Sequence, residues 1–242
     1  MKTQPTLLGV ALLLLLSCSE ADSANTTEPV EQKSGERCLP ASGTTGDPTT
    51  IYELLDLING LPHPVELPCL LESLDRPLSL NANFNTQSAQ PALGKRSPRI
   101  FVILNESLSM SLVPGAEATL EFGARTADEP GVSVKGELHF PVEGELAPED
   151  AFVRLAPAES TGLTLEQATS CGACHDNERP APAYPFRGAF ASAIVKPAPF
   201  FAVDVAAIER ERDSCDPAAE PERCAVLEAM FAHGDVVQTA FP

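Results

Sequence analysis

Apolar residues recur at every second position through the middle of the chain, and this alternation restricts the fold more than any other feature. It appears in residues 78–84, 107–113, 116–122 and 131–140. A period of two indicates strands with one buried face. Residues 99–105 are almost continuously apolar, which is typical of a central strand buried on both faces. Short strands separated by turn residues predict an antiparallel β-sandwich or small barrel, with residues 150–156 as a closing strand.

Helical spacing replaces this alternation near both ends of the pattern. Apolar residues in 50–59 recur at helical intervals, and Gly60 offers a stop. The proline-rich residues 61–77 that follow are expected to be irregular. Two more helices are predicted near residues 204–211 and from Pro221 to Gly234, because proline favours the first position of a helix.

These elements predict an α+β protein with two folded domains. Residues 49–157 would form a domain of one helix and the antiparallel sheet. Residues 158–242 would form a small α-helical domain. The polar residues 18–48 lack the large apolar side chains that a core needs, and are expected to form a disordered tether.

The first 18 residues read as an export signal. Lys2 precedes an apolar core from Leu7 to Leu16, which is too short to span a bilayer as a permanent helix. The sequence LLSC ending at Cys18 resembles a bacterial lipobox. The resemblance implies a signal peptide over residues 1–17, cleavage before Cys18 and a diacylglycerol on its sulfur, and Ser19 then favours the outer membrane. The alternative is an ordinary signal peptide cut a few residues later.

The chain is strongly acidic. It carries 34 acidic and 16 basic residues, a formal charge of -18. Such a charge repels phosphate backbones, so nucleic-acid binding is excluded. We expect the negative charge either to keep the protein soluble or to attract a basic redox partner.

Seven cysteines suit an exported protein, since export leads to an oxidising compartment. With Cys18 lipidated, six remain. The nearest neighbours among four of them predict two disulfides, Cys38–Cys69 and Cys215–Cys224, although four cysteines allow three connectivities. The even count also permits a third disulfide between Cys171 and Cys174.

The stretch Cys171-Gly-Ala-Cys174-His175 carries the clearest chemistry. Two thiols three residues apart can reach the two vinyl groups of one haem, and the next histidine then lies under the iron. The segment resembles the haem-attachment region of c-type cytochromes. The resemblance implies covalent haem c on Cys171 and Cys174, with His175 as proximal ligand. Residues 164–170 would form a helix leading into this motif.

A second axial ligand is sought in the last predicted helix. Met230 lies in its apolar stripe and His233 lies at the edge of the stripe. A thioether suits a pocket that excludes water, so Met230 is favoured over His233 as the sixth ligand. An iron with no protein ligand on this side is the third alternative.

Two functions follow from these observations. The first is an exported, lipid-anchored monohaem protein of the cell envelope, which acts in electron transfer or redox sensing with a partner protein. The second is a non-catalytic envelope or surface binding lipoprotein, in which Cys171–Cys174 is a structural disulfide and no haem is bound. No residue set predicts an enzyme active site.

Overall fold

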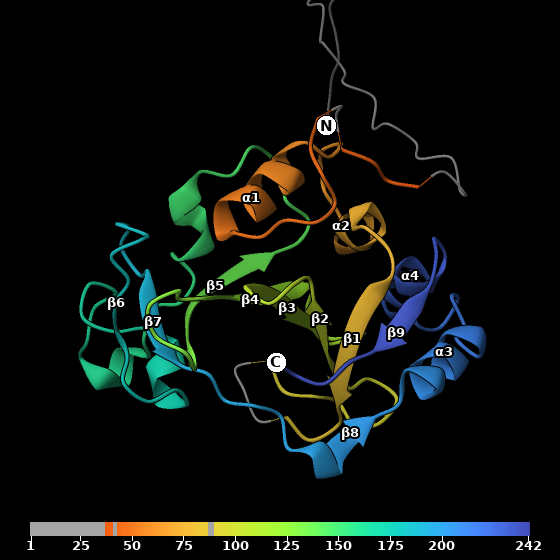
Figure 1. The fold of residues 1–242 in the computed structure, drawn as a ribbon. Coiled ribbons are helices and arrows are strands. Elements are labelled where there is room, and N and C mark those ends of the chain that lie inside the picture. The colour runs from red at the N-terminus through yellow and green to blue at the C-terminus, as the bar shows by residue number, and fades with distance from the viewer. Residues whose placement is uncertain (1–36, 41–42, 87–89) are drawn as a thin grey trace, which may run out of the picture. The chain divides into compact units, whose positions relative to one another are not determined.

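A nine-stranded sheet is formed by the residues that the structure describes, which are 37–242 without 41–42 and 87–89. The structure is a computed structural model, drawn as a ribbon in Figure 1. The predicted signal peptide 1–17 and the lipidation site Cys18 lie outside the described residues. The strands are β1 (Leu78–Asn83), β2 (Arg99–Ile103), β3 (Leu108–Leu112), β4 (Thr119–Arg125), β5 (Val132–His139), β6 (Arg179–Pro180), β7 (Phe190–Ala193), β8 (Ala202–Val203) and β9 (Val236–Gln238).

Their order in the sheet is β6-β7-β5-β4-β3-β2-β1-β8. All neighbours in this order pair antiparallel, while β9 pairs parallel with β1. The predicted α+β class and the mostly antiparallel sheet are therefore confirmed. The prediction of a sandwich or barrel was wrong, because the structure has one open sheet. Helices cover its apolar face, so that face needs no second sheet to bury it.

Two helices precede the sheet in the sequence. α1 (Ile51–Asn59) confirms the predicted helix, and the side chain of Thr50 caps it by accepting a hydrogen bond from the backbone N–H of Glu53. α2 (Leu67–Ser73) lies in the segment that was expected to be irregular. That expectation was wrong because Pro68 falls in the first helical turn, where its missing N–H costs no hydrogen bond.

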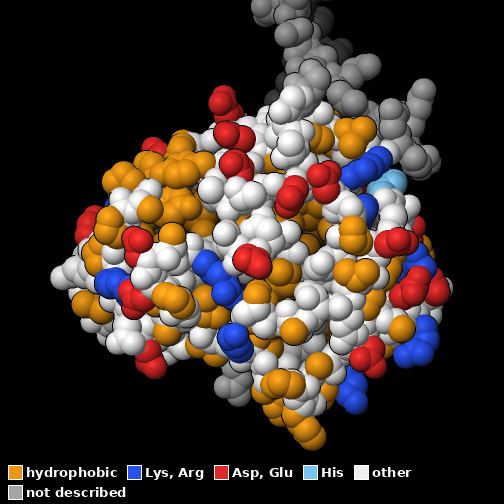
Figure 2. Space-filling model, viewed as in Figure 1, with side chains coloured by type: hydrophobic (Ala, Val, Ile, Leu, Met, Phe, Trp, Pro, Cys, Tyr) orange, Lys and Arg blue, Asp and Glu red, His pale blue; other side chains and the backbone are white. Residues whose placement is uncertain are grey.

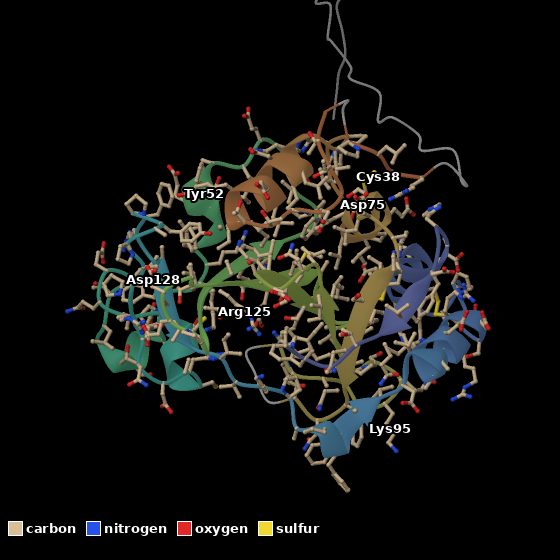
Figure 3. The ribbon with its side chains drawn as sticks, in the orientation of Figure 1. Cys38, Tyr52, Asp75, Lys95, Arg125 and Asp128 are labelled. Atoms are coloured by element: carbon tan, nitrogen blue, oxygen red, sulfur yellow. A yellow bond between two sulfur atoms is a disulfide. The ribbon has the colours of Figure 1, made fainter. Side chains whose placement is uncertain are left out.

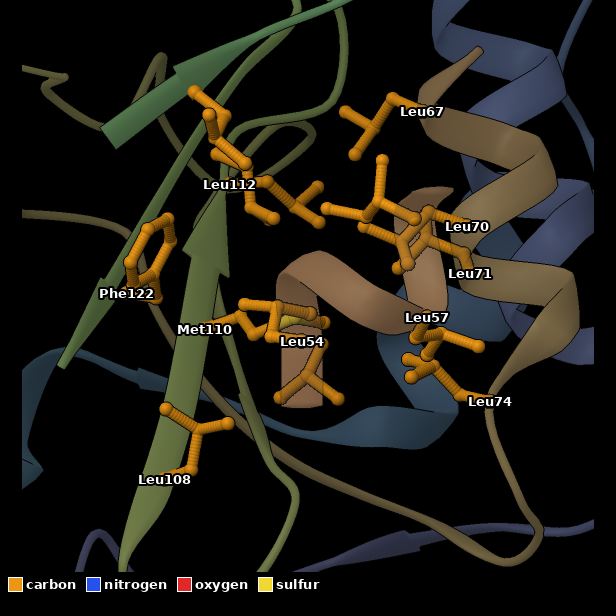
Figure 4. Packing of buried hydrophobic residues seen from close by; sticks show 14 of the residues in the cluster. Leu54, Leu57, Leu67, Leu70, Leu71, Leu74, Leu108, Met110, Leu112 and Phe122 are labelled. Atoms are coloured by element: carbon orange, nitrogen blue, oxygen red, sulfur yellow. The ribbon is translucent and has the colours of Figure 1, made fainter. Parts of the chain in front are cut away.

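The core lies between these helices and one face of the sheet. Alternate residues of β3 and β4, including Leu108, Met110 and Phe122, point from the sheet toward leucines of α1 and α2 (Figure 4). Leu54, Leu57 and Leu70 are fully buried there. Met110 is therefore a core residue, as the alternation predicts.

The C-terminal part of the chain belongs to the same unit. Residues 37–242 cluster together as one body, and residues 158–242 contribute β6, β7, β8 and β9 to the sheet. A separate α-helical domain was the wrong expectation, because short strands pair with β5 and β1 on either side of the central sheet. The predicted helices exist as α3 (Val205–Asp213) and α4 (Pro221–Phe231), and α4 packs against α2.

Two other local expectations were wrong. Residues 150–156 form no strand, because a 3₁₀ turn covers Pro148–Ala151 and the Asp150 carboxylate accepts the backbone N–H of Ala147. Residues 164–170 form no continuous helix, only turns that lead into a 3₁₀ turn at Ser170–Ala173.

Both predicted disulfides are present, Cys38–Cys69 and Cys215–Cys224. The first ties the start of the described chain to α2, near the Cys38 label of Figure 3. The Arg37 guanidinium also donates to the carbonyls of Glu72 and Leu74 at the end of α2. The expected tether therefore does not extend to residue 48, since Arg37 and Cys38 are already fixed to α2.

Among the described residues, no helix is long and apolar enough to cross a membrane. Hydrophobic side chains nevertheless reach the surface, as Figure 2 shows at its lower tip. Phe200, which precedes β8, is 87% exposed.

Candidate functional site

The second face of the sheet is polar. It carries the odd-numbered residues of the central strands, among them Arg99 of β2, Ser111 of β3, Glu121 of β4 and Lys135 of β5. These positions pair across neighbouring strands and point away from α1 and α2, because side chains alternate along a strand. The alternation thus places the apolar residues in the core and the polar residues on one shared surface.

A cavity of about 540 Å³ lies on this polar face. We call it the polar-face cavity. Arg99, Phe101 and Lys135 from the sheet line it together with Cys174 and His175. The ring of Phe241 near the C-terminus packs edge-on against Phe101, with 5.1 Å between ring centroids. A smaller hollow of about 90 Å³, lined by Cys171, Cys174 and His175 among others, adjoins the same strands.

The motif forms one helical turn beside this cavity. The carbonyl of Cys171 accepts hydrogen bonds from the backbone N–H of Cys174 at 3.0 Å and of His175 at 2.9 Å. Residues three and four apart share a face of such a turn. Cys171, Cys174 and His175 are thus brought together, as the spacing predicts.

The orientation of the turn is set by Thr169 and Glu178. Glu178 accepts hydrogen bonds from the backbone N–H of Thr169 at 2.8 Å and from its hydroxyl. Thr169 in turn caps the 3₁₀ turn by accepting from the backbone N–H of Cys171. A side chain at position 172 would meet the Glu178 carboxylate at 2.7 Å, so the small Gly172 lets Glu178 approach.

His175 has one ring nitrogen occupied and one open. Its Nδ1 lies 2.7 Å from the carbonyl oxygen of Ala193 in β7. A carbonyl only accepts, so Nδ1 carries the proton and Nε2 keeps its lone pair. Among the described residues, none hydrogen-bonds to Nε2. Burial lowers the pKa of His175, so the imidazole is neutral at neutral pH.

The two cysteines are free thiols in the structure, not the disulfide of the alternative interpretation. Cys174 is exposed and Cys171 is partly buried. Burial raises the pKa of Cys171 to about 11, although Thr169 hydrogen-bonds to it. A catalytic dithiol needs a thiolate near neutral pH, and this environment favours the protonated thiol instead.

The charges of the polar-face cavity are unequally neutralised. Arg99 Nη2 lies 2.5 Å from Glu121 Oε2 and 2.7 Å from the hydroxyl of Ser111. Lys135 donates instead to backbone carbonyls, with Nζ 2.8 Å from Ser192 O and 3.0 Å from Ser133 O. Burial lowers the pKa of Lys135 to about 8, so the ammonium stays mostly protonated at neutral pH.

Met230 and His233 do not join this site. Met230 is fully buried in the hydrophobic core, and Arg76 holds its backbone by donating to the carbonyls of Ala229 and Met230. His233 lies 3.9 Å from Glu72 at the end of α2. Neither residue lines the polar-face cavity. The structure therefore does not bring either predicted axial ligand into the cavity that His175 lines, because α4 packs against α2.

The sequence missed Ala193, Lys135 and Glu178. Ala193 acts through its backbone and Glu178 is one of many acidic residues, so neither gives a signal in the sequence. Lys135 gave a weak signal, because it is a charged residue within the alternating pattern of a predicted strand. His139 lies on the same strand face as Lys135, with its Nε2 2.9 Å from Glu137 Oε1.

Comparisons with family models, curated proteins and solved structures found no match to this chain.

Proposed function

We propose that the chain is a c-type haem protein that exchanges single electrons with a partner protein. The observation that carries the proposal is the state of His175. Its Nδ1–H is bound to the Ala193 carbonyl while Nε2 faces no protein donor. Histidines that bind metals characteristically donate their other ring nitrogen to a carbonyl or carboxylate, which fixes the tautomer.

The residues present fit a haem. The polar-face cavity, at about 540 Å³, falls within the roughly 300–1,000 Å³ of cofactor sites. Phe101 and Phe241 give it an aromatic wall, and Lys196 lines it with a cation suited to a carboxylate. Cys171 and Cys174 lie on the same turn as His175. This fit supports haem attachment on a sheet surface and not within a cytochrome c-like helical domain.

The free thiols support covalent attachment. Each thiol would add across one vinyl group, so that sulfur bonds to one carbon and the thiol hydrogen to the other. The addition consumes no oxidant, and it requires the reduced cysteines that the structure has. The bound haem would supply reversible one-electron exchange between Fe(III) and Fe(II).

The place of action in this proposal is the cell envelope. The export signal and the LLSC sequence favour a protein anchored in the outer membrane through a lipid on Cys18. The two disulfides support an oxidising compartment. The net charge of -18 favours a basic redox partner.

Haem staining of a denaturing gel tests the proposal. Full-length protein is expressed with a haem-maturation system and compared with Cys171→Ser/Cys174→Ser. We expect covalent haem in the wild type and none in the double variant, because thioethers survive denaturation. His175→Ala should retain attached haem with altered ligation, seen as a changed visible spectrum. An unstained wild-type band would refute the proposal and favour the binding lipoprotein without haem.

A further inference from the structure

Lys135 is a partly buried cation next to the proximal histidine. It extends from β5 across to β7, where Nζ donates to Ser192 O at 2.8 Å and lies 3.4 Å from Ala193 O. The same Ala193 oxygen accepts the proton of His175 Nδ1 at 2.7 Å. One backbone carbonyl therefore connects the lysine and the histidine.

The two nitrogens are close enough for strong interaction. Because both distances meet at the Ala193 oxygen, Nζ and Nδ1 are separated by at most about 6 Å, a range in which a charge perturbs its neighbour.

No direct counterion cancels this charge. Among residues 37–242 as described, the structure has no ion pair for Lys135. Glu121 is bound to Arg99, and Glu178 is occupied by Thr169. Glu137, on the same strand face, is bound to His139. The ammonium therefore donates to backbone carbonyls, and the Glu178 carboxylate acts on it only through space, without a direct contact.

We infer that Lys135 raises the reduction potential of the iron that His175 would bind. The inference rests on the proposed function. A fixed positive charge near the metal favours Fe(II) over the more positive Fe(III). The same ammonium weakens the Ala193 carbonyl as an acceptor, so His175 Nδ1–H stays less polarised and the imidazole less electron-rich. Hydrogen bonding behind a ligand is a recognised means of tuning a metal site. Both effects raise the reduction potential of the iron.

Lys135 is in this account a positioning residue that acts through Ala193 and His175. Lys95 provides the comparison, because it is an exposed lysine that does not line the cavity. A charge in contact with solvent is screened, and its removal should matter less.

The test is the midpoint potential of haem-loaded, full-length protein, measured by spectroelectrochemistry at slightly acidic pH, where Lys135 carries its proton. Lys135→Gln keeps a donor for the carbonyls and removes the charge. We expect it to shift the equilibrium about tenfold toward Fe(III), which is a potential lower by about 59 mV for one electron. Lys135→Arg, which keeps the charge, and Lys95→Gln should each shift the equilibrium less than about threefold.

Equal potentials in wild type and Lys135→Gln, with haem bound in both, would overturn this inference alone. A wild type without covalent haem would overturn the proposed function and the inference together. If Lys135→Gln does not accumulate as folded protein, Lys135→Met replaces it in the same comparison, with the same expected shift and the same refuting result.

Discussion

The ring of His175 is held by Ala193, 18 residues later in the chain, through a 2.7 Å hydrogen bond to a backbone carbonyl. This bond connects the motif turn to β7, and β7 pairs with β5 in the central sheet. The histidine thus has its orientation set by the sheet and not only by its own turn. His175 lines the polar-face cavity, and no described residue hydrogen-bonds to its Nε2, so the arrangement supports metal ligation.

The two motif thiols should differ in reactivity in haem-free, reduced protein. Cys174 is exposed, whereas burial raises the pKa of Cys171 to about 11. The thiolate is the reactive form, so alkylation of Cys171 should be slow at neutral pH and rise about tenfold per pH unit until pH approaches that value. Peptide mass spectrometry after iodoacetamide treatment measures both sites. Equal rates at neutral pH would contradict the buried position of Cys171.

Met230→Ala should reduce stability without changing haem ligation. Met230 is fully buried in the core, so the truncation should cost about 2–5 kcal/mol in the free energy of unfolding. The His233→Ala variant serves as control, and it should cost about 0.5 kcal/mol because its 3.9 Å pair with Glu72 is weak. Urea denaturation and the visible spectrum provide the two measurements. A spectral change in Met230→Ala would contradict its position in the core.

Gly136→Ala should destabilise the sheet. A Cβ at this position in β5 would lie 2.2 Å from the ring of Phe122 and 2.9 Å from the carbonyl oxygen of Ala151. Overpacking of this kind costs about 1–3 kcal/mol. Gly144→Ala is the matched control, since its Cβ would meet no atom within 4 Å, and it should change stability by less than about 0.5 kcal/mol. The same loss in both variants, measured by urea denaturation, would count against the packing at Gly136.

Removal of the two disulfides should have unequal effects. The Cys38–Cys69 bond closes a sequence separation of 31 residues, and the Cys215–Cys224 bond one of 9. A longer closed loop restricts the unfolded chain more. The free energy of unfolding should therefore fall by about 4 kcal/mol in Cys38→Ser/Cys69→Ser and by about 3 kcal/mol in Cys215→Ser/Cys224→Ser. Thermal unfolding of the two variants gives the order. The reverse order would show that packing around the cysteines, not loop closure, dominates.

Cys18→Ser should abolish lipid anchoring. The LLSC sequence predicts that the Cys18 sulfur carries the diacylglycerol, and serine cannot replace it. We expect the variant to leave the detergent phase in a detergent-partition experiment and to accumulate as uncleaved precursor. Ser17→Ala, which keeps the cysteine, should partition like the wild type. A Cys18→Ser protein that still partitions with the detergent would rule out the lipobox interpretation.

Local patterns in the sequence were sufficient for much of the secondary structure. The alternation in residues 107–113 and 131–140 identified the strands and the face of each that is buried, because side chains alternate on any strand whatever its partners. The helical spacing in residues 50–59 and the Gly60 stop identified α1 for the same local reason. The proximity of cysteines in the sequence found both disulfides. The motif spacing kept Cys171, Cys174 and His175 close in the chain, and in the structure they lie on one turn.

Tertiary structure alone decided how these pieces combine. Whether strands close into a barrel depends on what covers the apolar face, and here α1 and α2 cover it. Met230 and His175 are both plausible ligands by residue type, but packing of α4 on α2 buries the first and the pairing of β7 with β5 orients the second. Lys135 meets the carbonyl that holds His175 only because residues 58 positions apart are joined across two strands. Such contacts depend on the free energy of the whole packed chain, which no short stretch of sequence contains.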